Sequence, residues 1–308
     1  MLDEREVAGI SVFERGWLSS NNVLLRGGDD AAVIVDTGYW THSSQTVALL
    51  KQSLNGRPLA RILNTHLHSD HSGGNAAVQS AFGCGIDVPA GEAEAVDSWD
   101  ERRLSYAATG QHCPRFRRTG VLNAPSMVTA GRWSWDVVSS PGHDPMSVAL
   151  YQPDLQLLIS ADALWENGFG VVFPELEGID AFAAVEATLD VLSKLKVRLV
   201  IPGHGPPFKD HTGAISRARS RLSGFVRDPG KHALHAAKVL VKFRLLEKQA
   251  ESSLEFERWL TNTAYFDLVR QRYFPNTDAQ TWRRSIIDDM KRRGSLVVTD
   301  DDRIVNLN

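Results

Sequence analysis

Hydrophobic and polar residues alternate over short runs in the N-terminal part of the chain, a pattern typical of half-buried strands. Longer stretches with apolar residues three or four positions apart predict helices, and Phe182, Val185 and Leu189 form one such stripe. We expect strands over 10–13, 22–26, 31–35, 60–65, 133–138, 147–151, 155–160 and 197–201, and helices over 41–54, 75–82, 91–106 and 180–195. This order predicts an α/β (α+β) fold in which two sheets pack face to face and helices cover them.

From Gly213 onward the pattern becomes mostly helical. Apolar periodicity predicts helices over 214–226, 232–248, 253–261 and 279–293. A two-stranded hairpin over 295–299 and 303–307 follows, with Asp300, Asp301 and Asp302 at its turn. Helices that end in a β-hairpin have the order of a winged-helix module. We therefore expect a sheet-containing domain over 1–212 and a mostly helical, winged-helix-like C-terminal domain over 213–308.

The composition is that of a soluble globular protein, with 43% hydrophobic and 23% charged residues. No apolar run approaches the ~20 residues that a membrane-spanning helix needs, so no membrane partner is expected. The N-terminal segment MLDEREVAGI is acidic and lacks the basic-then-apolar order of a signal peptide, which favours a cytoplasmic location. The two cysteines, Cys84 and Cys113, form no CxxC pair, and we expect buried thiols.

The net charge of −3 hides an asymmetry between the two expected domains. Residues 213–308 carry a net charge of +6, and residues 1–212 carry −9. An acidic body with a basic tail supports the division into two modules. It also leaves open an anionic partner for the tail.

The segment THLHSDHSGGN, residues 65–75, places three imidazoles and a carboxylate directly after a predicted strand. Neutral imidazole and carboxylate are ligands of first-row transition metals, zinc above all, with iron and manganese as alternatives. Side chains in HxHxDH alternate in direction, so one metal can take His66 and His68 while a neighbouring metal takes Asp70 and His71. Neither pair completes a coordination sphere, and the hypothesis therefore requires further ligands at other strand ends.

Three residues meet this requirement: His143 in PGHD, Asp162 at the end of LQLLISAD, and His204 in PGHG. Each lies at or just after the C-terminal end of a predicted strand, where loops from one sheet edge converge. Adjacent glycines allow the tight turns that aim His143 and His204 at a shared point. A lone histidine near a strand end is more often an ordinary polar group, which we expect for His42, His112, His211, His232 and His235.

THLHSDHSGG, PGHD, SAD and PGHG occur in an order that resembles the metallo-β-lactamase fold superfamily, over about residues 8–212. The resemblance implies an αββα sandwich as the catalytic domain, with the site along one edge of the two sheets. It implies that His66, His68 and His143 bind a first divalent metal ion. Asp70, His71 and His204 would bind a second, and Asp162 would bridge the two.

The ligand identities are similar to the glyoxalase II-like branch of that superfamily. Antibiotic-hydrolysing lactamases lack the bridging aspartate, and the flavodiiron branch has glutamate at the position of His68. The resemblance implies a binuclear hydrolase in which a metal-bridging hydroxide, oriented by Asp70, attacks a small ester. A thioester of the acyl-CoA or S-acylglutathione type is the leading substrate. The alternatives are RNA or another phosphodiester, with the C-terminal domain contacting the RNA, and a lactone.

Two segments are candidates for substrate binding. The run WENGFGVVF follows Asp162 directly, and Trp165, Phe169 and Phe173 could wall a pocket or simply pack beneath the second sheet. The basic run RFRR could grip an anionic ester or lie on a solvated face; its cationic residues are Arg115, Arg117 and Arg118.

The basic tail could contact RNA, cap the mouth of the active site or mediate homodimerisation. Its basic residues are spread over four predicted helices and interspersed with acidic ones. Its predicted wing is acidic, and no aromatic stacking platform is evident. We therefore favour a cap or a dimer interface over a nucleic-acid surface.

Overall fold

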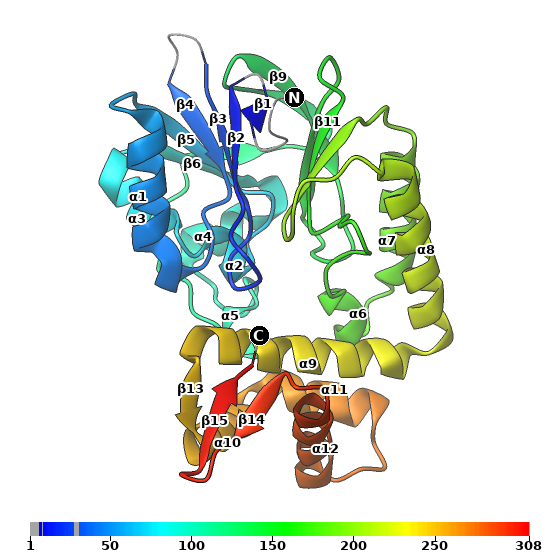
Figure 1. Ribbon diagram of the computed structural model, residues 1–308. Helices are drawn as coiled ribbons and strands as arrows, with labels where there is room; N and C mark the ends of the chain where they lie inside the picture. The colour runs from blue at the N-terminus through cyan, green and yellow to red at the C-terminus, as the bar shows by residue number, and fades with distance from the viewer. Residues whose placement is uncertain (1–5, 8, 28–30, 308) are drawn as a thin grey trace.

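The computed structural model describes residues 6–7, 9–27 and 31–307. Two sheets face each other between outer helices, and a helical C-terminal part lies beneath them (Figure 1). Residues 1–5 and 8 of the acidic N-terminal segment lie outside the described residues, as do residues 28–30. The first sheet has the order β1-β2-β3-β4-β5-β6-β7, with strands Glu6–Val7, Ile10–Phe13, Asn22–Leu25, Ala32–Val35, Leu59–Leu63, Gly85–Pro89 and Gly120–Leu122.

The second sheet has the order β12-β11-β10-β9-β8, and β12 runs parallel to β11. Apolar side chains of both sheets fill the space between them, with Leu25, Trp135, Leu150 and Ile159 buried in one cluster. This burial explains the short alternating runs, because one face of each strand must meet the opposite sheet. The strands are β8 Ser126–Ala130, β9 Trp133–Ser139, β10 Val148–Gln152, β11 Leu157–Ala161 and β12 Leu199–Pro202.

Helices cover the outer face of each sheet. Helix α1 (Ser43–Leu54) buries Leu50 and Leu54 against the first sheet, beside α3 (Asn75–Phe82). Helix α7 (Phe182–Ser193) buries the predicted stripe of Val185, Leu189 and Leu192 against the second sheet. Shorter helices lie in the connections: η1 Trp40–His42, α2 Ser69–Ser72, η2 Ala90–Glu92, α4 Ala93–Ser98, α5 Tyr106–Thr109 and α6 Phe173–Glu177.

The C-terminal part has its own core, which includes Val241, Phe266, Trp282 and Ile304. Its longest helix, α9, lies beneath both layers of the sandwich (Figure 1). The expected hairpin β14–β15 is present, and β13 pairs with β15 to make a third strand. The elements are α9 Pro229–Lys248, β13 Ala250–Ser252, α10 Ser253–Asn262, α11 Ala264–Tyr273, α12 Ala279–Arg292, β14 Leu296–Val298 and β15 Arg303–Asn306.

Helix α8 (His211–Arg227) packs with α7 in the core of the second sheet, through Ala218, Leu222 and Phe225. The sequence placed it in the C-terminal domain, after a boundary at 212. The C-terminal core, which Val171 and Leu176 of the preceding part also join, includes α9 and the helices after it but no residue of α8. We therefore propose that the boundary lies at Asp228, between α8 and α9. Within the described residues, no helix is both long and apolar enough to cross a membrane.

The helix expected over 91–106 is shorter than predicted. Helix α4 ends at Ser98, because Trp99 adopts a left-handed conformation with φ 54° and stops the hydrogen-bond ladder. A turn follows, and α5 begins only at Tyr106. The sequence pattern also missed several short elements, among them α2, α5, α6, α11, β6, β7, β8 and β13.

Candidate metal centre

The first group of histidines joins two loops at the same sheet edge. His66 and His68 lie on the connection between β5 and α2, and His143 lies between β9 and β10. One ring nitrogen from each lies within 4.8 Å of the others. Nδ1 of His68 and Nε2 of His143 are only 2.7 Å apart. Three imidazoles that converge in this way can form one face of a tetrahedral metal site.

The second group comes from three other chain segments. Asp70 and His71 lie on α2, Asp162 follows β11, and His204 follows β12. Their ligand atoms also lie within 4.8 Å of one another. His204 Nε2 is 3.0 Å from Asp70 Oδ2, and His71 Nε2 is 3.4 Å from Asp162 Oδ1. The structure therefore brings together all seven candidate ligands, in two adjacent groups.

Asp162 lies between the two groups. Its Oδ2 is 3.4 Å from Nε2 of His143 in the first group and 3.9 Å from Nε2 of His204 in the second. The indole Nε1 of Trp165 donates a hydrogen bond to its Oδ1, at 3.1 Å. A carboxylate in this position can contribute one oxygen to each group.

Hydrogen bonds at the far side of two rings fix their orientation. His71 Nδ1 donates to Asp36 Oδ2 at 2.8 Å, and His143 Nδ1 donates to the carbonyl of Val171 at 2.5 Å. Each ring therefore directs Nε2 into the site, as in known metal–histidine arrangements. Asp36 was not predicted, although its position at the end of the apolar run AAVIVD could have suggested it.

The buried polar atoms fit a bound cation. Nε2 of His66 and Nε2 of His71 are buried and have no hydrogen-bond partner among the described residues. Such an atom is costly in a protein interior unless a donor or a cation meets it. The backbone at Gly203 packs closely against the site, because a Cβ at this position would lie 2.1 Å from Asp162 Oδ1. The donor set is nitrogen and oxygen, which suits zinc, iron and manganese.

The electrostatics of the site also favour a cation. Burial lowers the pKa of His66 and lowers the pKa of His68 to about 3, so both rings are neutral, as metal ligands must be. Burial alone would raise the pKa of Asp162, but His71 and His204 outweigh it and hold the pKa well below its ordinary value. Against the effect of burial, Asp162 in turn raises the pKa of His71 and of His204, so these two rings supply the positive charge that the buried carboxylate requires and that a bound metal ion would replace.

A cavity of about 670 Å³ opens onto both groups. Trp17 lies at its wall, with its ring stacked on His204 at a centroid distance of 5.5 Å, although this side chain is 59% exposed and was not predicted. Helix α9 supplies a further wall with apolar side chains. The ligand residues that line the cavity are His68, Asp70, His143, Asp162 and His204, and the helix contributes Val239, Leu240, Phe243 and Leu246.

Two of the predicted substrate residues, Trp165 and Phe173, line this cavity. Phe169 does not: it is buried in the core of the second sheet, 6.3 Å from the ring of Phe225.

The basic run RFRR does not line the cavity either. Arg118 pairs with Asp97, Arg115 donates to the carbonyl of the same residue, and Arg117 exchanges hydrogen bonds with Gln79. These contacts hold the run against α3 and α4. The solvated-face interpretation of this segment therefore agrees with the geometry.

Comparison with known proteins decides the family. Residues 15–204, which contain both candidate ligand groups, match the Metallo-beta-lactamase superfamily. The chain belongs to this superfamily. The predicted family is thereby confirmed. Members of this superfamily use divalent metals, and the two groups of residues match a two-metal site.

Two curated proteins to which the chain is similar have names that denote thioester hydrolysis. It is 31% identical over 115 residues to hydroxyacylglutathione hydrolase from Hyphomonas neptunium, covering 37% of this chain and 38% of that protein. It is 26% identical over 217 residues to acyl-coenzyme A thioesterase MBLAC2 from Homo sapiens, covering 62% of this chain and 76% of that protein. The chain thus spans well under half the length of the first relative.

A solved structure shows the same fold over nearly the whole metallo-beta-lactamase chain. A beta-lactamase domain protein from Burkholderia ambifaria is similar with a TM-score of 0.58 and 24% identity, over 98% of this chain and 94% of that chain. The likeness includes the helical C-terminal part. The expected fold class, a sandwich followed by a helical C-terminal region, is confirmed.

Proposed function

We propose that this chain is a binuclear metal-dependent hydrolase that cleaves a small thioester. The observation that carries the proposal is the cavity that both ligand groups line, since it brings a substrate within reach of either metal position. The names of the two curated relatives support a thioester as the bond that is broken.

We assign His66, His68 and His143 to a first metal ion, and Asp70, His71 and His204 to a second. Asp162 would lie between the two ions and could contribute to both, in agreement with its contacts to both groups. When bound, a pair of divalent cations lowers the pKa of water to near neutrality and polarises a carbonyl oxygen. Zinc is the leading candidate, and the same nitrogen and oxygen donors accept iron or manganese.

The protein side chains then orient the reaction. Asp70 lines the cavity and is held by His204, so its carboxylate can accept a proton from the attacking water. Trp17 and Trp165 pack beside His204 and shield that side of the site from bulk water. The apolar face of α9 and Phe173 accommodate an acyl chain.

A substrate panel tests this proposal. The protein, reconstituted separately with zinc, iron and manganese, is offered acyl-CoA, S-acylglutathione, a lactone and single-stranded RNA. We expect two bound metals per chain and the highest kcat/KM for a thioester. Less than one metal per chain would contradict the binuclear site, and turnover of RNA alone would replace the thioesterase proposal with the endoribonuclease one.

A further inference from the structure

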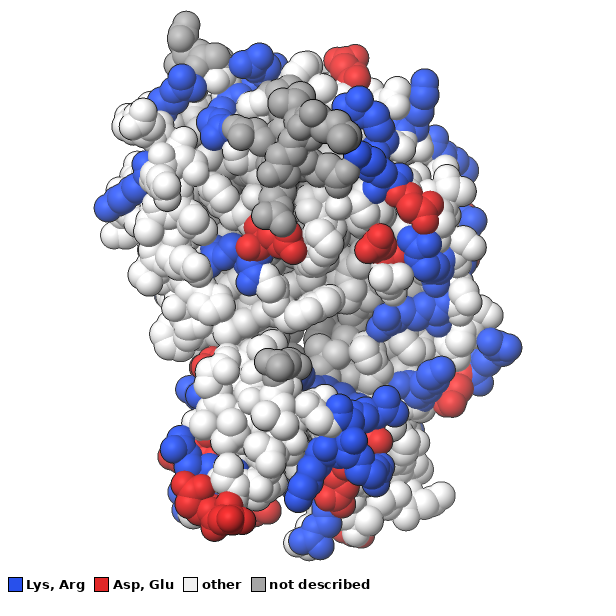
Figure 2. Space-filling model, in the orientation of Figure 1, with Lys and Arg blue, Asp and Glu red and all other residues white. Residues whose placement is uncertain are grey.

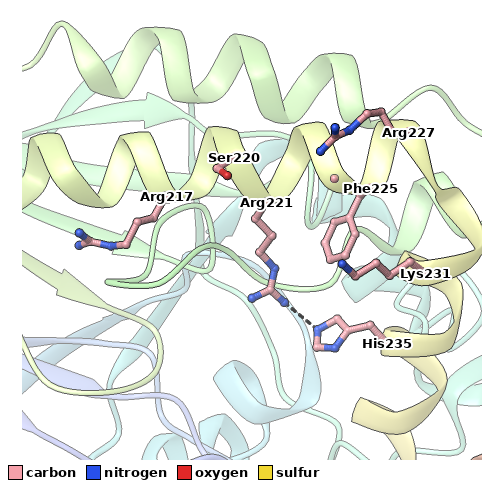
Figure 3. Close-up of a pocket in the computed structure, with 8 residues that line it drawn as sticks. Arg217, Ser220, Arg221, Phe225, Arg227, Lys231 and His235 are labelled. Carbon is pink, nitrogen blue, oxygen red and sulfur yellow. Dashed lines mark hydrogen bonds between the residues drawn. The ribbon is translucent and has the colours of Figure 1, made fainter.

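A second pocket of about 670 Å³ lies where α8 meets α9 (Figure 3). Its lining is strongly basic. Helix α8 contributes Arg217, Arg221 and Arg227, and α9 contributes Lys231 and His235. The lining contains neither Asp nor Glu among the described residues. We call this hollow the basic pocket.

Three of its cations lack an acidic partner. Arg217 pairs with Asp210, at 2.9 Å. By contrast, no carboxylate of the described residues lies within 4.0 Å of the side-chain nitrogens of Arg221, Arg227 or Lys231. Uncompensated positive charge gathered in a concave site attracts anions. Lys and Arg side chains also gather over α8 and its junction with α9 in Figure 2.

Arg221 is positioned rather than free to move. Its guanidinium donates to His235 Nε2 at 2.8 Å, as the dashed line in Figure 3 marks. The group also lies 5.4 Å from the ring centroid of Phe225 and 5.9 Å from that of Phe169. Its Nε is buried and has no hydrogen-bond partner among the described residues. A guanidinium fixed in this way is prepared to bind phosphate oxygens.

The basic pocket is continuous with the metal cavity. Arg221 and His235 line both. Along α9, Lys231, His235, Val239 and Phe243 follow one another at intervals of four residues and therefore share one face. This face is cationic beside the basic pocket and apolar beside the metal centre. A single elongated molecule can thus place an anionic end in one compartment and an acyl group in the other.

We propose that the basic pocket binds the phosphate groups of a coenzyme A-type carrier whose thioester lies at the metal centre. The inference rests on the proposed thioesterase function and specifies its substrate class. Coenzyme A carries a diphosphate and a 3′-phosphate at the end of a long flexible arm, whereas glutathione carries carboxylates close to its sulfur. The separation of the basic pocket from the metal ligands therefore suits the longer, phosphorylated carrier.

The pocket also suits a small molecule better than a nucleic acid. Its cations converge on one hollow from two helices, whereas a single-stranded nucleic acid requires a groove with aromatic stacking surfaces. At the far end of the C-terminal part, the turn between β14 and β15 presents an acidic cluster in Figure 2, which would repel a phosphate backbone.

A charge-removal experiment tests the proposal. Arg227 and Lys231 are exposed, so the double variant Arg227→Ala/Lys231→Ala removes two charges without disturbing the core. The matched control, Arg284→Ala/Lys291→Ala, removes the same charges from exposed positions on α12 outside both cavities. Binding of adenosine 3′,5′-bisphosphate to the metal-stripped protein is measured by calorimetry, which reports on the pocket independently of catalysis.

We expect the bisphosphate to bind the wild type and the control equally, and to bind the pocket variant about tenfold more weakly or worse. In the metal-loaded protein, the ratio of kcat/KM for acyl-CoA to kcat/KM for S-acylpantetheine should fall to a similar extent. Unchanged nucleotide affinity in the pocket variant, or equal kcat/KM for both thioesters in the wild type, would overturn the proposal.

Two further outcomes separate this inference from the proposed function. If neither thioester is hydrolysed but the bisphosphate binds as expected, the thioesterase proposal fails and the phosphate pocket stands. If single-stranded RNA displaces the bisphosphate from the wild type and is itself cleaved, the pocket serves nucleic acid and the carrier proposal is wrong.

Discussion

His71 donates a hydrogen bond from Nδ1 to Oδ2 of Asp36, at 2.8 Å, and both side chains are almost closed to solvent. The same carboxylate accepts hydrogen bonds from the backbone N–H and the hydroxyl of Thr65, at 2.9 and 2.7 Å. Asp36 therefore connects the end of β4 both to the loop that carries the first histidines and to a ligand candidate of the second group.

The substitution Asp36→Asn should weaken the second metal position. An amide is uncharged and presents a donor as well as an acceptor, so it no longer fixes the tautomer of His71. Removal of such an outer hydrogen-bond partner reduces metal affinity or activity by about 10–100-fold. Competition with a chelator measures the affinity, with Asp300→Asn at the exposed hairpin turn as the control. Equal affinity in both variants would show that Asp36 has no role in holding the metal.

The substitution His68→Ala should abolish turnover while the chain remains folded. The side chain belongs to the first ligand group and lines the cavity rather than the core. Removal of a hydrogen-bond partner of a metal ligand already reduces metal affinity or activity by about 10–100-fold. Removal of a ligand itself should therefore reduce kcat/KM by more than about a hundredfold. His112→Ala is the matched control, because His112 is exposed and outside both ligand groups. Full activity in the His68 variant would mean that the site is misassigned.

The substitution Gly203→Ala should displace the carboxylate of Asp162, which lies between the two ligand groups. The new methyl group would lie 2.1 Å from Asp162 Oδ1 and 3.0 Å from Cε1 of His71. Overpacking of this kind costs about 1–3 kcal/mol, so the midpoint of thermal unfolding should fall by several degrees. Metal analysis should find less than the wild-type content. Normal content and activity would show that Asp162 can move without consequence.

Stability should depend on pH through Glu92. Burial, with Asp144 nearby, raises the pKa of this carboxyl to about 7. A raised pKa means that the folded chain binds more protons than the unfolded chain between pH 4.5 and 7, so stability falls as pH rises across that window. The shift corresponds to about 3 kcal/mol.

Glu92→Gln removes this titration. At pH 8 the free energy of unfolding of the variant should exceed that of the wild type by up to about 3 kcal/mol. This difference should vanish toward pH 4. Denaturant unfolding of the metal-stripped proteins at several pH values provides the comparison. If the free energies of unfolding of the two proteins change in parallel between pH 4 and pH 8, the expected protonation of Glu92 is ruled out.

The clustered ligands could be predicted because six consecutive residues, HLHSDH, carry four of them. The remaining three were found from strand ends with adjacent glycines or apolar runs. Trp17 has no such signal, and although Asp36 ends an apolar run as Asp162 does, its contacts could not be read from the sequence. Asp36 meets Thr65 only because β4 and β5 pair in parallel, with Val35 opposite Leu63, and that register is a property of the tertiary fold.

The substrate residues show the same limit. Trp165 and Phe169 are similar aromatic residues in one loop, and only the position of α8 decides that Phe169 packs against Phe225 while Trp165 lines the cavity. In the tail, the local hairpin β14–β15 was predicted, whereas the three residues of β13 pair with a strand about fifty positions away and leave no local pattern.

Helix α9 carries both Lys231, at the basic pocket, and Phe243, at the metal cavity. With a rise of 1.5 Å per residue, their backbone positions are about 18 Å apart. A continuous helix keeps this span constant whatever the surrounding loops do. The enzyme would therefore select substrates by the length of their carrier, because a substrate must span a set distance between its charged end and its acyl group. A shorter molecule could contact either the basic pocket or the metal cavity, but not both.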